Sequence, residues 1–173
     1  KIKELEKDNN SKEITISKSR EKDIPKDLLF SITSHLKQLN ISTSNLSKKK
    51  YIFDESIDNL LLNEKDLVDK IFLDLQSHLI LCEKNSGIWS VEYLNEIVFG
   101  QKKPYDLKTL NEGVPIMCTK NNNELGLSNG DIGVLIGLKN KRKYLFRKFN
   151  DNNEEIVALI DPSNLENVVP AIA

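Results

Sequence analysis

Apolar residues recur at helical spacing in two stretches of the first half of the chain. The first stretch opens with Asp23 and Pro25, which suit an initial helical turn, and the polar residues 40–50 after it are expected to form a loop. Its apolar face consists of Leu28, Leu29, Ile32, Leu36 and Leu39. The second stretch opens with Asn63 as the expected helix cap. Its apolar face consists of Leu67, Val68, Ile71, Phe72 and Leu75.

The pattern changes at residues 79–82 (LILC), a short apolar run suited to a buried strand. Polar residues 83–87 then predict a turn, and Ser90 is the expected cap of a third helix. The inner face of that helix would hold Val91, Leu94, Ile97 and Val98. Helices alternating with a strand are typical of an α/β layer, so residues 63–99 are predicted to form one edge of a parallel sheet with covering helices.

The second half of the chain is strand-like. Four segments rich in β-branched and aromatic residues follow one another, with short polar turns between them: 113–120, 131–139, 143–149 and 154–161. Because no helix pattern separates them, they predict a small antiparallel barrel of SH3-like size, whose closure would remove free edges. The predicted fold class is a helix-rich α/β part followed by a small all-β SH3-like barrel.

Composition divides the chain into five parts. Residues 1–22 are mainly charged and polar and are expected to form a flexible segment. Residues 23–100 would be the α/β part, residues 101–112 a linker, and residues 113–168 the barrel. Residues 169–173 would begin a further strand. Since the chain starts without Met and stops inside an apolar run, it is expected to be a fragment of a longer protein.

Residues 121–137 contain a specific turn between two of the predicted strands. Three of its positions allow positive φ angles or a close backbone approach: Gly126, Gly130 and Gly133. Asn129 precedes a glycine in a strong tight-turn pair, and Leu125 and Leu127 are expected to plug one end of the barrel. This is no phosphate-binding loop, because the GxxxxGK[ST] order is missing and no helix pattern follows.

Composition and charge narrow the classes of partner. The net charge of -1 gives no global attraction to nucleic acid or membrane, so such a partner must bind a local patch. No apolar run has the length of a membrane span, and a membrane partner is not expected. Cys82, Cys118, His35 and His78 lack metal-ligand spacing, so no metal site is expected. Two free thiols are typical of a reducing, cytoplasmic location.

Residues 113–133, GVPIMCTKNNNELGLSNGDIG, resemble the segment GxPVMxxxNxxxLGLxNGDIG of the exodeoxyribonuclease V alpha subunit family (RecD), which are superfamily 1B DNA helicases. The resemblance extends over roughly residues 63–173. The residues that match the family pattern are Gly87, Asn95, Pro115, Asn122, Gly126, Asn129, Gly130, Asp131 and Gly133. The resemblance implies that residues 23–100 belong to the second RecA-like motor domain (2A), and that the barrel is its SH3-like insertion (2B).

The same resemblance implies an activity for the parent protein. Relatives hydrolyse ATP with Mg²⁺ to move along single-stranded DNA, in a nuclease–helicase whose subunits repair double-strand breaks and support recombination. ATP hydrolysis needs a Walker A lysine, a Mg²⁺-binding acid and an arginine finger, and the chain contains none of these motifs. No catalytic residue, cofactor or metal is therefore expected here, and the chain alone should not hydrolyse ATP.

DNA contact is the activity that the residues themselves could support. Residues 139–148 (KNKRKYLFRK) contain no acid, and basic side chains with exposed aromatic rings suit phosphates and bases. The candidate DNA-binding residues are Lys139, Lys141, Arg142, Lys143, Tyr144 and Arg147. Strand alternation puts Tyr144 and Phe146 on one face, which leaves open that they are core residues of a solvated hairpin. A stand-alone SH3-like module that binds protein or RNA is the alternative function.

Overall fold

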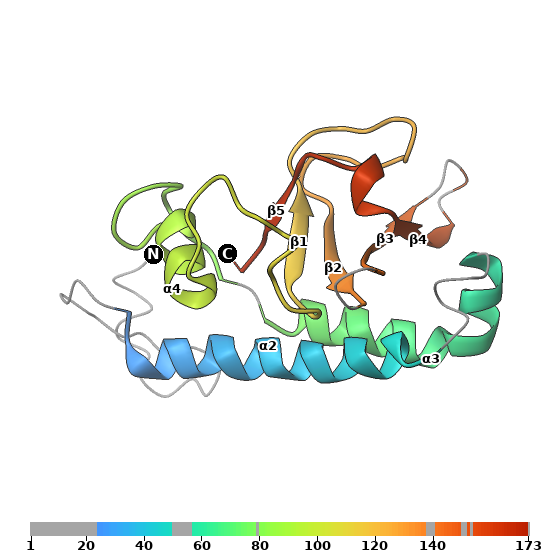
Figure 1. The fold of residues 1–173 in the computed structure, drawn as a ribbon, viewed down its shortest axis with the longest axis horizontal. Helices are drawn as coiled ribbons and strands as arrows, with labels where there is room; N and C mark the ends of the chain where they lie inside the picture. The colour runs from blue at the N-terminus through green and yellow to red at the C-terminus, as the bar shows by residue number, and fades with distance from the viewer. Residues whose placement is uncertain are drawn as a thin grey trace, which may run out of the picture.

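The computed structural model describes residues 24–49, 57–78, 80–137, 141–149, 152 and 154–172, with only the backbone of residues 57–62. The expected flexible segment 1–22 lies outside the described residues. The α-helices of the described part are α2 (Lys26–Ser47), α3 (Ile57–Gln76) and α4 (Val91–Phe99). Helices α2 and α3 run side by side under the strands, whereas α4 lies beyond the end of the sheet (Figure 1). The fold is therefore a mixture of helices and sheet.

An antiparallel five-stranded sheet organises the second half of the chain, in the order β4-β3-β2-β1-β5. Its strands are β1 (Pro115–Cys118), β2 (Ile132–Ile136), β3 (Lys143–Phe149), β4 (Glu155–Ile160) and β5 (Val168–Pro170). A short 3-10 helix, η2 (Pro162–Asn164), connects β4 to β5. Each of the four predicted strand segments contains one of these strands.

The sheet is open, so the expected closure into a barrel is wrong for the described residues. Strands β4 and β5 are its two edges, and they do not pair with each other. The physical reason is the length of β5, which has three residues, all of them paired with β1. Such a short strand offers no second ladder that could reach β4.

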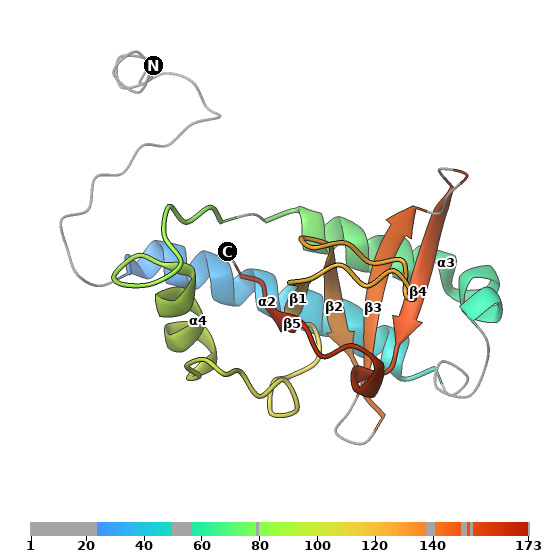
Figure 2. The same cartoon turned by 90° about the horizontal axis from the view of Figure 1, so that it is seen from above.

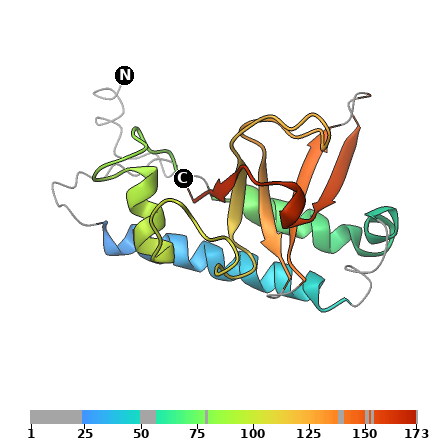
Figure 3. The ribbon, with the colours of Figure 1, turned by 45° about the horizontal axis from the view of Figure 1, so that its top comes forward.

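The two faces of the sheet are covered by different structures, as Figure 3 shows. On one face, Val134, Ile136 and Leu145 pack against apolar side chains of α2 and α3. The opposite face is covered mainly by loop residues instead of helices, among them Leu110 and Leu127. Because side chains alternate along a strand, the sheet residues divide cleanly between the two faces.

Helix α4 is attached through a third apolar cluster. Its Leu94 packs with Ile32 of α2 and with Ile172, which follows β5. The expected cap is confirmed, since the Ser90 side chain accepts a hydrogen bond from the amide of Tyr93 (3.1 Å). Figure 2 shows α4 beside the first half of α2 and away from the strands.

The predictions for the helical half were wrong in three places. Residues 40–47 continue α2 instead of forming a loop, because Leu46 is buried against α3 and the Ser42 hydroxyl donates to Asp74 of that helix. The prediction also missed the start of α3 at Ile57. Glu64 has non-helical angles (φ -130°, ψ 26°), so a kink divides α3 just after Asn63, where the sequence placed the start of the second helix.

The third error concerns the parallel sheet. Residues 80–82 form no strand, and residue 79 lies outside the described part. Parallel pairing among the described residues is limited to the isolated bridge between Lys84 and Ser90. Four apolar residues cannot be told from an apolar loop segment by pattern alone, and here Ile80 and Cys82 pack in the cluster beside α4.

Candidate functional site

The loop that joins β1 to β2 is fixed by its own polar side chains. Asn122 Oδ1 accepts a hydrogen bond from the Leu125 amide (3.0 Å), and Asp131 Oδ2 accepts one from the amide of Ser128 (2.8 Å). Leu127 is buried among the sheet residues, and Leu125 packs beside it. The prediction that these two leucines plug one end of a barrel is wrong, because the sheet is open; they instead cover part of one face of the sheet. The turn thus serves to close the face of the sheet that no helix covers.

Arg147, one of the candidate DNA-binding residues, is tied to other side chains. Its guanidinium lies over the Phe72 ring, 4.4 Å from the centroid, and Nη2 donates to the Asp69 carboxylate. Its Nε lies 2.7 Å from Glu155 Oε1, without the alignment of a hydrogen bond. Two carboxylates therefore compensate this cation, and it links β3 to α3 and β4.

The other hairpin cations have different partners. Lys143 Nζ lies 3.1 Å from Asp161 Oδ2, whereas Arg142 Nη1 donates to the Leu107 carbonyl (2.8 Å). Hydrogen bonds from the Ser163 amide and hydroxyl, and then from Lys143, lower the pKa of Asp161 to about 2. Asp161 is therefore ionised at neutral pH and offsets the charge of Lys143.

The remaining basic residues of segment 139–148 lie at or beyond the ends of β3. Lys141 is exposed, and Lys139 lies outside the described residues. Lys148 donates through Nζ to the Leu125 carbonyl and so holds the β1–β2 loop against β3. Arg142 and Lys148 thus donate to uncharged carbonyl groups, and no acid of the described part of the chain forms an ion pair with either of them.

The aromatic residues of β3 belong to the core. Tyr144 and Phe146 have 4% and 0% of their surface exposed, on the face covered by loops. Burial raises the pKa of Tyr144. The prediction that strand alternation places both rings on one face is confirmed, and neither ring offers a free face to a nucleic-acid base.

Four residues of the family pattern lie outside the loop, and one of them, Gly133, belongs to β2. Pro115 opens β1 opposite Val134, and Gly87 has a positive φ of 92° in the turn before α4. Asn95 is buried in α4, where its Nδ2 donates to Tyr105 Oη (3.2 Å) and to the Pro170 carbonyl (3.5 Å). Asn95 therefore connects α4 to the last strand.

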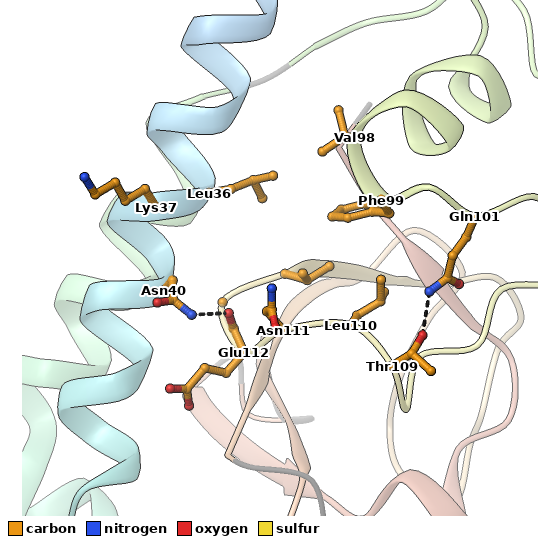
Figure 4. Close-up of a pocket in the computed structure, with 12 residues that line it drawn as sticks. Leu36, Lys37, Asn40, Val98, Phe99, Gln101, Thr109, Leu110, Asn111 and Glu112 are labelled. Carbon is orange, nitrogen blue, oxygen red and sulfur yellow. Dashed lines mark hydrogen bonds between the residues drawn. The ribbon is translucent and has the colours of Figure 1, made fainter.

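A cleft of about 640 Å³ lies between α2, the end of α4 and residues 109–114 (Figure 4). Leu36 and Phe99 face it from the two helices, and Leu110 lies below the Phe99 ring. Sequence reasoning missed this site, because residues 101–112 were interpreted as a linker and α2 was expected to end before Asn40. The sequence signal that could have found it is the aromatic Phe99 at the end of an amphipathic helix, next to a polar segment.

Two ends of the cleft are fixed by hydrogen bonds that Figure 4 also shows. On one side, Asn40 Nδ2 donates to the Glu112 carbonyl (2.8 Å), and on the other Gln101 Nε2 donates to Thr109 Oγ1 (2.7 Å). Gly113 is needed at the first of these ends, since it has a φ of 84° and a Cβ there would lie 2.5 Å from the Asn40 backbone nitrogen. The segment before β1 thus lies directly against α2.

A second groove of about 610 Å³ lies between the two long helices and β1, and a histidine pair lines it. The rings of His35 and His78 stack with centroids 4.9 Å apart. Burial and the charge of His78 lower the pKa of His35, and Asp74 acts in the opposite direction. Among the described residues, no group of three or more His, Cys, Asp or Glu side chains could hold a metal ion.

Neither a membrane span nor a disulfide occurs in the described part of the chain. No helix there is long and apolar enough to cross a bilayer. Cys118 is buried and Cys82 half-buried, and both are free thiols. Burial raises the pKa of the Cys82 thiol, so this group is mainly protonated at neutral pH.

Replacing Arg147 by Met should lower the free energy of unfolding by about 2 kcal/mol, as measured by urea unfolding followed by circular dichroism. The variant keeps an aliphatic side chain but loses the contact with Phe72 and the pairs with Asp69 and Glu155. Lys70→Met is the control, since it removes one exposed pair within α3 and should cost less than about 0.5 kcal/mol. Equal losses in the two variants would contradict a linking role for Arg147.

Comparison with known proteins indicates one relationship. No protein-family model matches the chain. The RecBCD enzyme subunit RecD of Buchnera aphidicola subsp. Schizaphis graminum (strain Sg) is 30% identical to it over 103 residues. The match covers 54% of this chain and 17% of the length of that relative. The chain is thus similar to a small part of a RecD protein, in agreement with the resemblance of residues 113–133.

Proposed function

We propose that this chain is a segment of a RecD-like DNA helicase subunit that acts in double-strand break repair and recombination. The observation that carries the proposal is the similarity to a RecD protein over 54% of the chain. Helices α2 to α4 would belong to the second RecA-like motor domain, and the sheet would be its SH3-like insertion. ATP and Mg²⁺ would bind elsewhere in the complete subunit, whose partners would be DNA and the other subunits of an exodeoxyribonuclease V complex.

Within that function, the hairpin of β2 and β3 is the proposed contact for single-stranded DNA. The charges of Lys143 and Arg147 are offset by neighbouring carboxylates, so these two residues contribute little net attraction to phosphate. Among the described residues, Arg142 donates to a carbonyl and has no carboxylate partner. Phosphate contact is therefore expected at Arg142, and the basic sequence around it makes Lys139 and Lys141 further candidates.

Fluorescence anisotropy of a labelled dT oligonucleotide, titrated with the chain at two salt concentrations, tests this contact. Binding should be weak and should fall as the salt concentration rises, because phosphate neutralisation releases counterions. Arg142→Ala should weaken binding about three- to tenfold and reduce the salt slope by about one. Changing Lys139 and Lys141 to Ala in addition should abolish binding.

Lys26→Ala is the matched control for these variants. It also removes one positive charge, but far from the hairpin. Lys26 is the first residue of α2, and the hairpin lies at the opposite end of this helix, where the Ser47 hydroxyl accepts a hydrogen bond from the Gly137 amide. Its affinity for dT should equal that of the parent chain. Binding unchanged by Arg142→Ala would overturn the proposed DNA contact. A preference for folded RNA over dT would also overturn it, and would favour an RNA-binding module.

A further inference from the structure

We propose that the cleft between α2, α4 and residues 109–114 binds a base of single-stranded DNA, an inference that rests on the proposed function. A nucleotide-sized ligand needs a concave site of several hundred Å³ that is mostly preformed. The cleft has a volume of about 640 Å³, and hydrogen bonds at Asn40 and Gln101 fix its two ends. Its size and rigidity therefore suit one unstacked base with part of its sugar.

One wall of the cleft offers a surface on which a base could stack. Phe99 and Val98 come from the end of α4, and Leu36 projects toward them from α2 (Figure 4). Phe99 is half-buried and packs with core residues on both sides of the cleft, so its ring is held in place. A fixed aromatic ring beside aliphatic side chains binds the flat face of any base, whatever its identity.

The opposite wall offers one hydrogen-bonding side chain for the edge of the base. Asn111 is exposed, its amide lies across the gap from Leu36 and Phe99 in Figure 4, and the described residues provide it with no hydrogen-bond partner. A primary amide both donates and accepts, as the edges of all bases do. The other two side-chain amides that line the cleft already have partners, since Asn40 donates to the Glu112 carbonyl and Gln101 binds Thr109 and Asp106. Asn111 is therefore the group that would contact the base.

The charged residues at the cleft do not compete for a neutral ligand. The Glu112 carboxylate accepts hydrogen bonds from the hydroxyls of Ser44 and Ser47, and in Figure 4 it points away from the cleft. The amine of Lys37 also points outward in that view. With no charged group directed inward, the cleft suits an uncharged aromatic base better than a phosphate or a free nucleoside diphosphate.

The proposed phosphate contact lies close to the cleft along the chain. Arg142 donates to the carbonyl of Leu107, and the cleft wall begins at Thr109, two residues later. Residues 107–109 form a turn, in which the Thr109 amide donates to the Asp106 carbonyl, so Arg142 is anchored beside the end of the cleft where Gln101 binds Thr109. A strand that contacts the guanidinium of Arg142 could thus place a neighbouring base against Phe99.

The experiment compares two labelled probes by anisotropy at low salt: a twelve-nucleotide dT strand, and a strand with the same number of phosphates and abasic sugars. The dT strand should bind about tenfold more tightly, the usual effect of one stacked base. Asn111→Ala and Phe99→Leu should each remove most of this difference while leaving the affinity for the abasic strand unchanged. Asn123→Ala, which removes another exposed asparagine away from the cleft, should behave like the parent chain.

The outcomes separate the two proposals. Equal, salt-dependent affinity for both strands, unchanged in Asn111→Ala, would overturn the base site while the hairpin contact stands. No binding of either strand would overturn the proposed DNA contact and the base site together. Because Phe99 also packs in the core, urea unfolding of Phe99→Leu accompanies the titration, and Asn111→Ala provides the decisive result if that variant is unstable.

Discussion

The Phe146→Ala variant should lose about 4 kcal/mol of unfolding free energy, the cost of a large cavity in a packed core. Phe146 has no exposed surface and lies in the middle of β3, where it packs among the residues of the loop-covered face. Collapse of the site is restricted, because Gly133 lies opposite on β2 and contributes no side chain that could fill the space. Urea unfolding followed by circular dichroism measures the loss.

Phe149→Ala is the matched control on the same strand. Phe149 is 67% exposed, so its removal should cost less than about 1 kcal/mol. If Phe146→Ala does not fold, Phe146→Leu should still fold with a loss of about 1.5 kcal/mol. Similar small losses for Phe146→Ala and Phe149→Ala would show that Phe146 is not a core residue, and would return it to the candidates for base stacking.

The strands could be predicted from the sequence because their alternation is local information. Tyr144, Leu145 and Phe146 of β3 are all buried, but a period of two already places Leu145 on the face opposite to the two aromatic rings. Ser90 was predictable for the same reason, since a cap needs only one side chain and the amide three residues later. The closure of the sheet was not predictable, because it depends on whether two distant edge strands meet.

The end of α2 shows how tertiary contacts override local preference. Ser42, Thr43 and Ser44 have low helix propensity, and their sequence predicts a loop. In the fold, Ser42 donates to Asp74 of α3 (2.5 Å) and Ser44 donates to Glu112. These acceptors lie 32 and 68 residues away in the sequence, so no local pattern could reveal them.

The candidate site was only partly predictable for a related reason. The sequence shows that residues 139–148 are basic, but it does not show which cations have carboxylate partners. The partners of Arg147 come from α3 and β4, and that of Lys143 follows β4. The cleft was missed altogether, because Phe99 and Asn111 face each other only once α4 has packed beside α2.

Gly133→Ala is expected to lower the free energy of unfolding by about 3 kcal/mol, because the β3 strand leaves no room for a side chain at this position of β2. A Cβ at this position would lie 2.5 Å from the Leu145 carbonyl oxygen and 2.7 Å from Phe146 Cδ1. The ring could turn, but the carbonyl is part of the β3 backbone, which is paired with β2 and cannot withdraw without loss of that pairing. The last glycine of the NGDIG string is thus required by a backbone contact in the centre of the sheet.

Urea unfolding distinguishes this contact from the general cost of replacing a turn glycine. Gly130→Ala is the control, because Gly130 has a φ of 96° but a Cβ added there would meet no atom within 4 Å, so only backbone strain of about 1 kcal/mol applies. Combining Gly133→Ala with Phe146→Leu should not restore stability, since the clash with the Leu145 carbonyl remains. A Gly133→Ala variant as stable as Gly130→Ala would contradict the close approach, and the glycine would then need an explanation outside the packing of β2 on β3.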